Sequence, residues 1–243
     1  MITSKSNALI KRIRSLSDKK FRDEFGLFVV EGVKSVNEAI NSSLEVSVIV
    51  GTEKGLSAIS SGGEKIEQVS EEVFLSISGE KSPQGVLAVV NKPKAISPFS
   101  GNRAILLDGV SDPANVGAII RTAAAVGITG VFAVGSCADP FSPKSVRASM
   151  GGIFKINYRE TEYSKISEEI GLPLIVADMG GENIFNFSVP EKFCLVIGNE
   201  GKGVSQTLKS NADYTVSIPM ENGVESLNAA VSAGILMYLL KNS

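Results

Sequence analysis

Three loops of the chain combine glycine with polar side chains, a composition that lets the backbone approach a ligand closely. The first loop, DGVSDPANVGAIIR, contains Asn115 and Arg121, and the second, IGNEGKGVS, has Glu200 in its middle. The third, IPMENGVESLN, ends with residues 226–228 before a long apolar segment. Each loop follows an apolar run typical of a buried strand. Because ligands of open α/β sheets bind at the carboxyl ends of strands, the three loops predict one ligand site.

The second loop is not a known phosphate-binding motif. A P-loop requires lysine and then serine or threonine after its last glycine, but Val204 follows Gly203. The dinucleotide fingerprint G-x-G-x-x-G is also absent from this loop. Two interpretations of the loop alone remain, which are an exposed glycine-rich turn and a backbone that contacts a ligand.

In the third loop, Ser226 and Asn228 stand before an apolar helix. Ser226 is predicted to be the N-cap, whose side chain accepts a hydrogen bond from a backbone amide two or three residues on. Asn228 has no such local role, and a polar amide beside a buried helix needs a partner. We therefore expect Asn228 to contact another loop or a ligand.

The absence of histidine excludes several kinds of chemistry. Ser-His-Asp and Cys-His catalysis need an imidazole, and so does a zinc site that contains histidine. The only two cysteines, Cys137 and Cys194, lie far apart in apolar sequence. We predict that the chain has no metal site and that both thiols are free, as in the reducing cytoplasm. The N-terminus has no apolar secretory core, and the longest apolar run has 12 residues, too few to cross a membrane.

Helix and strand patterns alternate in two segments on either side of a proline-containing stretch, NKPKAISPFSGN. We predict a small N-terminal α/β domain at 1–95, a linker at 96–102 and a second α/β domain at 103–243. The strands of the second domain are almost continuously apolar, which is typical of a mostly parallel open sheet with helices on both faces. The segment 136–152 is predicted to be a loop.

The three loops resemble, in order, the three motifs of the SpoU (TrmH-type) RNA ribose 2′-O-methyltransferases. The matching residues are Asn115, Gly117 and Arg121, then Gly198, Glu200, Gly201 and Gly203, then Ile218, Pro219, Met220, Ser226, Leu227 and Asn228. The segment 143–152 is also similar to the family. Residues 1–95 resemble its RNA-binding domain of L30-like fold, through FRDEFGLFVVEG and SPQGVLAVV.

The resemblance implies S-adenosylmethionine as the methyl donor, a homodimer, and a deep trefoil knot of the SPOUT class. It places the cofactor at Gly198, Asn199, Gly203, Ile218 and Leu227. It assigns the catalytic polar set to Arg121, Glu200, Asn115, Ser226 and Asn228. Arg121, Glu200 and water all remain candidates for accepting the proton of the ribose hydroxyl, because a guanidinium with a pKa above about 12 is a poor base.

The N-terminal segment fits RNA as the partner that the resemblance implies. Residues 1–22 contain seven basic side chains and one acidic one, although the whole chain has a net charge of −2. Such an excess of positive charge suits phosphate contact, but it also occurs on ordinary solvated helices. The candidates for RNA contact are Lys11, Arg12, Arg14 and Arg22.

The predicted substrate is structured RNA, with large-subunit ribosomal RNA favoured over tRNA. One alternative is a non-catalytic RNA-binding or ribosome assembly factor on the same fold. The other is an unrelated α/β enzyme that binds a nucleotide.

Overall fold

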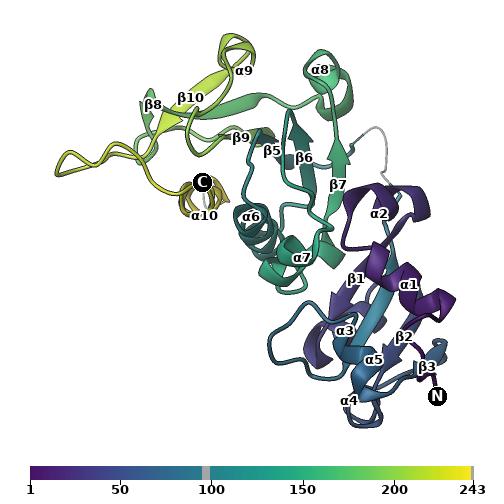
Figure 1. Cartoon of the computed structure of the whole chain (residues 1–243). Helices are drawn as coiled ribbons and strands as arrows, with labels where there is room; N and C mark the ends of the chain where they lie inside the picture. Colours follow the sequence, from purple (N-terminus) through teal and green to yellow (C-terminus); the bar gives the residue numbers. More distant parts are fainter. Residues whose placement is uncertain (95–98, 242–243) are drawn as a thin grey trace. The chain divides into compact units, whose positions relative to one another are not determined.

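The computed structural model describes residues 1–94 and 99–241, which form two compact units (Figure 1). The first unit comprises residues 1–93 and 139–154, and the second comprises 94–138 and 155–243. Part of the predicted linker, residues 96–98, lies outside the described residues.

Residues 139–154 join the first unit, although the sequence pattern placed them in the second domain. The ring of Phe28 packs against Phe141 and Phe154, with centroids 5.1 and 6.5 Å apart. The guanidinium of Arg22 forms an ion pair with Asp139 at 2.7 Å. The segment therefore packs in the core of the first unit. These contacts join residues far apart in the sequence, so the local pattern of apolar residues could not predict them.

A four-stranded sheet organises the first unit. The strand order is β1 (Leu27–Glu31), β4 (Val86–Asn91), β2 (Val46–Gly51) and β3 (Ile66–Gln68). β4 runs antiparallel to β1 and β2, and β3 is parallel to β2. Five helices of residues 1–93 accompany the sheet: α1 (Ala8–Ser15), α2 (Lys19–Phe25), α3 (Val33–Ile40), α4 (Glu53–Ser57) and α5 (Glu71–Leu75). Apolar side chains of α1 and α5 form one core cluster with β2 and β4.

The second unit is built on a six-stranded sheet whose pairings are all parallel. The order is β10 (Tyr214–Ser217), β8 (Leu174–Asn183), β9 (Phe193–Gly198), β5 (Arg103–Asp108), β6 (Gly130–Val134) and β7 (Asn157–Glu160). α8 (Ile166–Ile170) and α9 (Gln206–Ser210) lie on one side of the sheet, and α6 (Pro113–Val126) and α10 (Ala229–Lys241) lie on the other (Figure 1). A short 3-10 helix occurs in this unit at Tyr163–Lys165, and another, Gly152–Lys155, spans the point where the chain passes from the first unit to the second. The predicted open α/β sheet is confirmed, and the trefoil knot stays a prediction.

The segment predicted to be a loop at 136–152 contains a helix, α7 (Pro143–Ser149). The side chain of Ser142 caps it by accepting a hydrogen bond from the amide of Ser145, and Pro143 fits the first helical position. The Ser-Pro pair is therefore the signal that could have predicted this helix. Among the described residues no helix is both long and apolar enough to span a membrane.

Candidate active site

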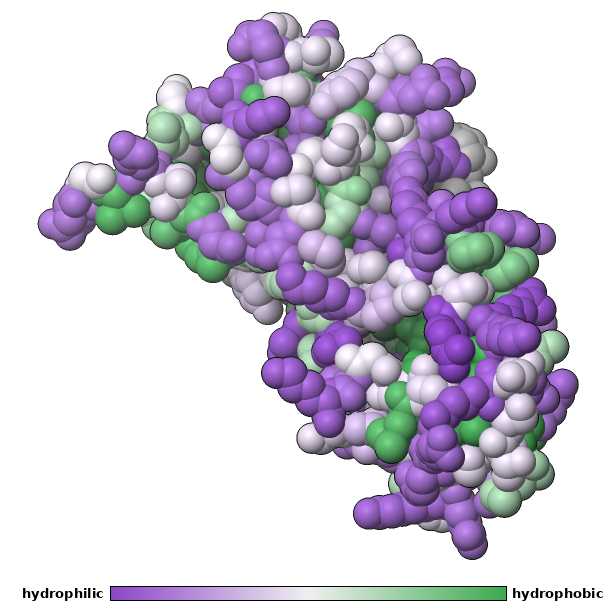
Figure 2. Space-filling view, in the orientation of Figure 1, coloured by the Kyte–Doolittle hydropathy of each residue, from purple (hydrophilic) through white to green (hydrophobic). Residues whose placement is uncertain are grey.

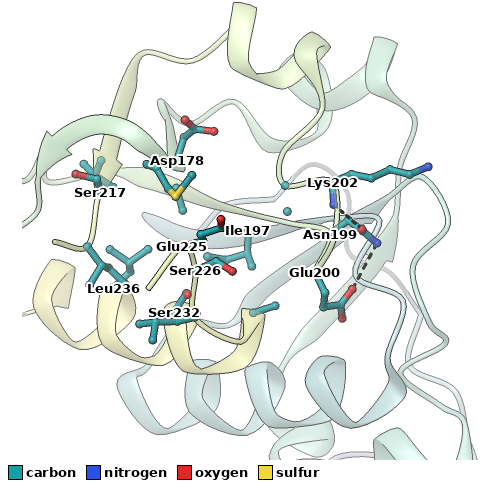
Figure 3. A pocket seen from close by; sticks show the side chains of 18 of the residues that line it. Asp178, Ile197, Asn199, Glu200, Lys202, Ser217, Glu225, Ser226, Ser232 and Leu236 are labelled. Carbon is teal, nitrogen blue, oxygen red and sulfur yellow. Dashed lines mark hydrogen bonds between the residues drawn. The ribbon is translucent and has the colours of Figure 1, made fainter. Parts of the chain in front are cut away.

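A pocket of about 390 Å³ opens in the second unit, beside the middle of β8 and the ends of β9 and β10 (Figure 3). Its lining combines the backbone of the loop at 198–203 with apolar side chains from β9, the third loop and α10. All five residues predicted to bind a cofactor line it: Gly198, Asn199, Gly203, Ile218 and Leu227. The structure thus brings the second and third loops together around one cavity.

Gly198 permits the tight turn that forms one wall of this pocket. A Cβ atom at this position would lie 2.2 Å from the carbonyl carbon of Gly203 and 2.3 Å from the nitrogen of Val204. Two backbone hydrogen bonds of 3.0 and 2.9 Å between Asn199 and Gly203 hold the turn closed. The backbone of Gly203 has a φ of 67°, in the left-handed region that favours glycine.

The side chain of Asn199 shapes the second loop from within (Figure 3). Its Nδ2 donates to the carbonyl oxygen of Gly109 at 2.8 Å, and its Oδ1 accepts from the backbone amides of Gly201 and Lys202 at 2.9 and 3.0 Å. Both polar atoms of this side chain thus form hydrogen bonds within the protein. Asn199 therefore acts on a ligand in the pocket through the loop conformation that it stabilises.

A buried carboxylate that the sequence reasoning missed supports the same loop. Asp108, at the end of β5, is 4% exposed and accepts hydrogen bonds of 2.6 Å from the backbone amide of Ser205 and the hydroxyl of Tyr163. Burial and the hydrogen bond to Asp108 raise the pKa of Tyr163, so the phenol remains a donor at neutral pH. An acidic residue ending an otherwise apolar strand is the signal that could have identified Asp108.

Three predicted polar residues, one from each loop, form a hydrogen-bonded chain. Asn228 Nδ2 donates to Asn115 Oδ1 at 3.0 Å, and Asn115 Nδ2 donates to Glu200 Oε1 at 2.9 Å. Asn115 is buried in the first turn of α6, so its amide is aligned by the helix that carries it. The chain Asn228–Asn115–Glu200 therefore connects the three loops side chain to side chain.

Glu200 lies at one end of this chain and is anchored as a carboxylate. Partial burial opposes its ionisation, but hydrogen bonds from Asn115 and from the backbone amides of Ser111 and Asp112 outweigh that effect and lower its pKa. Glu200 is therefore charged at neutral pH and is a weak base.

Arg121 is separate from this chain within one copy of the protein. It is an exposed residue of α6 and does not line the pocket. It forms no hydrogen bond or ion pair with the described residues, and Glu200 is held by other partners. Within one copy of the protein, Glu200 therefore accepts hydrogen bonds from Ser111 and Asn115, and Arg121 is not among its described partners.

The predicted start of the final helix is corrected by the structure. α10 begins at Ala229, and Asn228 is its cap, because Asn228 Oδ1 accepts from the amides of Ala230 and Val231 at 2.9 and 3.3 Å. Ser226 lies in the preceding loop and lines the pocket. The two amide atoms of Asn228 serve different purposes, since the oxygen caps the helix and the nitrogen reaches Asn115.

The prediction that Arg22 contacts RNA is wrong. Its side chain is 3% exposed, pairs with Asp139, and donates from Nη1 to the carbonyl oxygen of Leu16 at 2.7 Å. Burial with a fixed acidic partner leaves no surface for a phosphate. Lys11, Arg12 and Arg14 are exposed, and RNA contact by these three stays a prediction.

Acidic groups of the pocket were also missed by the sequence reasoning. Asp178 and Glu225 line it (Figure 3). Asp178 also forms an ion pair with Lys209. Asp178 lies within β8, two residues after the buried run at 174–176, so an acidic residue just beyond an apolar run was the available signal. Among residues 1–94 and 99–241, no group of three or more Cys, Asp or Glu side chains could hold a metal ion.

We expect Asn115→Ala to lower the free energy of unfolding by about 1–3 kcal/mol, because it leaves the polar groups of Asn228 and Glu200 without their shared partner. Urea denaturation of Asn115→Ala, Asn228→Ala and the double variant measures the coupling between the two amides. Thr122→Ala on the same helix is the control, since among the described residues its hydroxyl bonds only to the carbonyl oxygen of Ala118. If the losses of unfolding free energy in Asn115→Ala and Asn228→Ala simply add in the double variant, the two amides are not coupled and the proposed hydrogen-bonded chain is contradicted.

The geometry defines a class of protein, a parallel α/β unit whose strand-end loops enclose a site for a nucleotide-sized ligand. Residues 102–238 match the model of the SpoU rRNA Methylase family, and residues 7–88 match the MRM3-like substrate binding domain. The chain belongs to the SpoU rRNA methylase family, which confirms the resemblance predicted from the three motifs.

Two relatives span nearly the whole chain. A protein of Bacillus subtilis (strain 168) named 23S rRNA (guanosine(2553)-2'-O)-methyltransferase RlmP is 31% identical over 99% of this chain and 98% of its own length. A protein of Streptomyces viridochromogenes named 23S rRNA (uridine(2479)-2'-O)-methyltransferase is 30% identical over 98% of this chain and 90% of its own.

The solved structures agree with this assignment. The AdoMet-bound rRNA methyltransferase from Sinorhizobium meliloti has a TM-score of 0.87 at 30% identity and covers 99% of this chain and 97% of that one. The SpoU methyltransferase AviRb from Streptomyces viridochromogenes, in complex with AdoMet, has a TM-score of 0.85 at 27% identity, over 97% of each chain.

Proposed function

We propose that this protein transfers a methyl group from S-adenosylmethionine to a ribose 2′-hydroxyl of large-subunit ribosomal RNA, in the cytoplasm. The observation that carries the proposal is the pocket lined by the second and third motif loops, to which hydrogen bonds of Asn115 join the first loop. Relatives named as 23S rRNA 2′-O-methyltransferases match almost the whole chain, including the N-terminal unit. The match to a substrate binding domain at residues 7–88 supports RNA as the partner.

The residues of the pocket fit S-adenosylmethionine. Apolar side chains of Ile218 and Leu227 can cover the faces of an adenine, and the crowded backbone at Gly198 admits no side chain in between. Asp178 and Glu225 supply carboxylates, which suit a cationic sulfonium ligand. The cofactor supplies a methyl group on positively charged sulfur, ready for in-line displacement.

The chain's own residues then position the reacting groups. The hydrogen bonds among Asn228, Asn115 and Glu200 fix the relative positions of the loops, so alignment is the main contribution of these residues. Because the pKa of Glu200 is lowered, we infer that this carboxylate orients the loops and does not receive the proton. Arg121 is exposed and has no described partner, so its guanidinium is available for an RNA phosphate.

A methyl-transfer assay tests the proposal. Labelled S-adenosylmethionine is supplied with transcripts of large-subunit rRNA, small-subunit rRNA or tRNA, and modified positions are mapped by their resistance to alkaline cleavage. We expect label at a ribose of the large-subunit transcript and none when that nucleotide is 2′-deoxy. RNA binding without any transfer would instead establish the non-catalytic assembly factor, and transfer to tRNA alone would overturn the substrate assignment.

We also propose that the protein works as a homodimer that pairs through α10. Val231 and Tyr238 are each 50% exposed and lie seven residues apart, on one side of a helix that is apolar around most of its circumference. Hydrophobic residues gather near the loop between β10 and α10, whereas most of the face visible in Figure 2 is hydrophilic. An exposed apolar helix side of this kind marks an interaction surface.

Sedimentation equilibrium measures the predicted dimer. We expect Tyr238→Glu to convert it to monomer, because a carboxylate would be buried against apolar side chains. Phe185→Glu, at an exposed aromatic residue outside α10, is the control and should leave the dimer intact. A monomeric wild-type protein would refute the pairing.

A further inference from the structure

A second pocket, of about 190 Å³, lies within the first unit. It is formed by α1, β1, the turn at 76–80 and α7, so the segment 139–154 supplies one of its walls. None of its lining residues belongs to the three motifs. Its apolar sides come from residues such as Val29, Ile77 and Val146, and four serine side chains also line it.

The decisive polar group in this pocket is the carboxylate of Glu31, at the end of β1. It accepts hydrogen bonds from the Ser78 hydroxyl and, at 2.9 Å, from the Gly79 backbone amide. One carboxylate oxygen binds Ser78 and the other binds Gly79, and these two bonds fix the plane of the carboxylate. Each carboxylate oxygen can accept a second hydrogen bond, which leaves a pair of parallel acceptor positions.

Two parallel acceptors select among the RNA bases. Guanine presents two adjacent donors, N1–H and the N2 amino group, on its Watson–Crick edge. Adenine and cytosine present one amino donor beside an acceptor nitrogen, and uracil presents one donor between two carbonyl oxygens. A carboxylate therefore matches guanine and repels part of the edge of each other base.

Two guanidinium groups accompany this carboxylate. Arg14 donates to the carbonyl oxygen and hydroxyl of Ser76 at 3.3 and 3.0 Å, and Arg147 pairs through Nε with Glu80 at 2.6 Å. Both side chains are partly exposed, and each guanidinium has five N–H donors, so donors remain for a further ligand. Fixed guanidinium groups are well suited to bind phosphate oxygens.

We propose that this pocket binds an unpaired guanine nucleotide of the RNA, with its base edge on Glu31 and its phosphates on Arg14 and Arg147. Sequence-specific RNA recognition uses unpaired bases of this kind, packed between side chains and bound along their Watson–Crick edges. The assignment rests on the proposed function insofar as RNA is the ligand. It gives the N-terminal unit a base-specific contact in addition to its exposed positive charges.

Titration of the full-length protein with nucleoside monophosphates tests the proposal. S-adenosylhomocysteine is kept at saturation so that the first pocket is blocked, and binding is followed by calorimetry. We expect GMP to bind at least tenfold more tightly than IMP, which lacks the N2 amino group, and more tightly than AMP, CMP or UMP. Equal binding of GMP and IMP would overturn the proposal.

Two variants and one control locate the binding. Glu31→Gln replaces one acceptor by a donor and should lower GMP affinity at least tenfold. Gly79→Ala should also lower GMP affinity at least tenfold, because the added methyl group would occupy part of the pocket beside Glu31 and Arg147. Its Cβ would lie 3.8 Å from Glu31 Oε2 and 3.9 Å from Arg147 Nη2, which are ordinary contact distances, so the turn itself need not shift. Glu45→Gln, an exposed carboxylate outside the pocket, should bind GMP like wild type. Thermal melting confirms that each variant is folded, and unchanged GMP affinity in folded Gly79→Ala and Glu31→Gln would refute the site.

The two proposals fail separately. If the protein transfers methyl groups but binds GMP and IMP equally, the guanine-binding proposal is refuted and the proposed methyltransferase function stands. If the protein methylates no RNA but prefers GMP to IMP, and this preference depends on Glu31, the proposed reaction is refuted and the pocket stands as an RNA-binding site.

Discussion

Gly198→Ala is expected to weaken the binding of S-adenosylmethionine about a hundredfold. The new Cβ would lie 2.2–2.5 Å from three backbone atoms of Gly203 and Val204, and backbone cannot rotate away as a flexible side chain can. The second loop must therefore shift, and the pocket wall shifts with it. A hundredfold loss corresponds to about 2.7 kcal/mol, within the range of 1–3 kcal/mol typical of overpacking a close-packed site.

Gly201→Ala in the same loop is the matched control for this prediction. Its Cβ would meet only Asn199 Oδ1, at 3.7 Å, an ordinary contact. Calorimetric titration with S-adenosylmethionine should give near wild-type affinity for Gly201→Ala and little heat for Gly198→Ala. Similar affinity for both variants would show that the loop backbone does not form the cofactor site.

Arg121→Ala is expected to lower the rate of methyl transfer by about 10²–10³ without changing stability or cofactor affinity. The side chain is exposed and outside the pocket, so its loss should change the free energy of unfolding by no more than about 0.5 kcal/mol. The resemblance of the first loop to the family motif predicts that this arginine takes part in the reaction. Loss of a charge that contacts RNA next to the reacting ribose would misalign the hydroxyl that must attack the methyl group.

Single-turnover rates, melting temperature and cofactor affinity of Arg121→Ala separate this role from a structural one. Arg121→Lys should restore part of the rate if the group binds a phosphate, because an ammonium retains the charge. Lys192→Ala, an exposed cation in the same unit, is the control. A wild-type transfer rate in Arg121→Ala would contradict the assignment.

The sequence predicted the second sheet and the grouping of its loops more accurately than it predicted the roles of individual side chains. Apolar runs such as ILL and LVI at β5 and β9 are buried on both faces, and parallel strands bring their carboxyl ends to one edge. The meeting of the loops at 198–203 and 218–227 follows from that topology. The roles within them do not, because a cap is identified only when the first helical residue is known: the sequence pattern favours Ser226, whereas Asn228 caps the helix that begins at Ala229.

Arg22 and Arg14 show the same limit in the N-terminal unit. Both are basic residues beside apolar ones, and periodicity does not distinguish them. Arg22 is buried because Asp139, more than a hundred residues away, supplies a matching charge, whereas Arg14 remains exposed at the second pocket.

By itself, the sequence determined the α/β class, the three motifs and their family, because strand periodicity and loop composition are local properties. The tertiary structure alone decided that residues 139–154 complete the first unit, that Asn228 joins Asn115 and Glu200, and that Arg121 stands apart from them. These outcomes depend on which side chains, far apart in the sequence, have complementary charge and shape and can form hydrogen bonds with each other. That pairing is settled by packing of the whole chain.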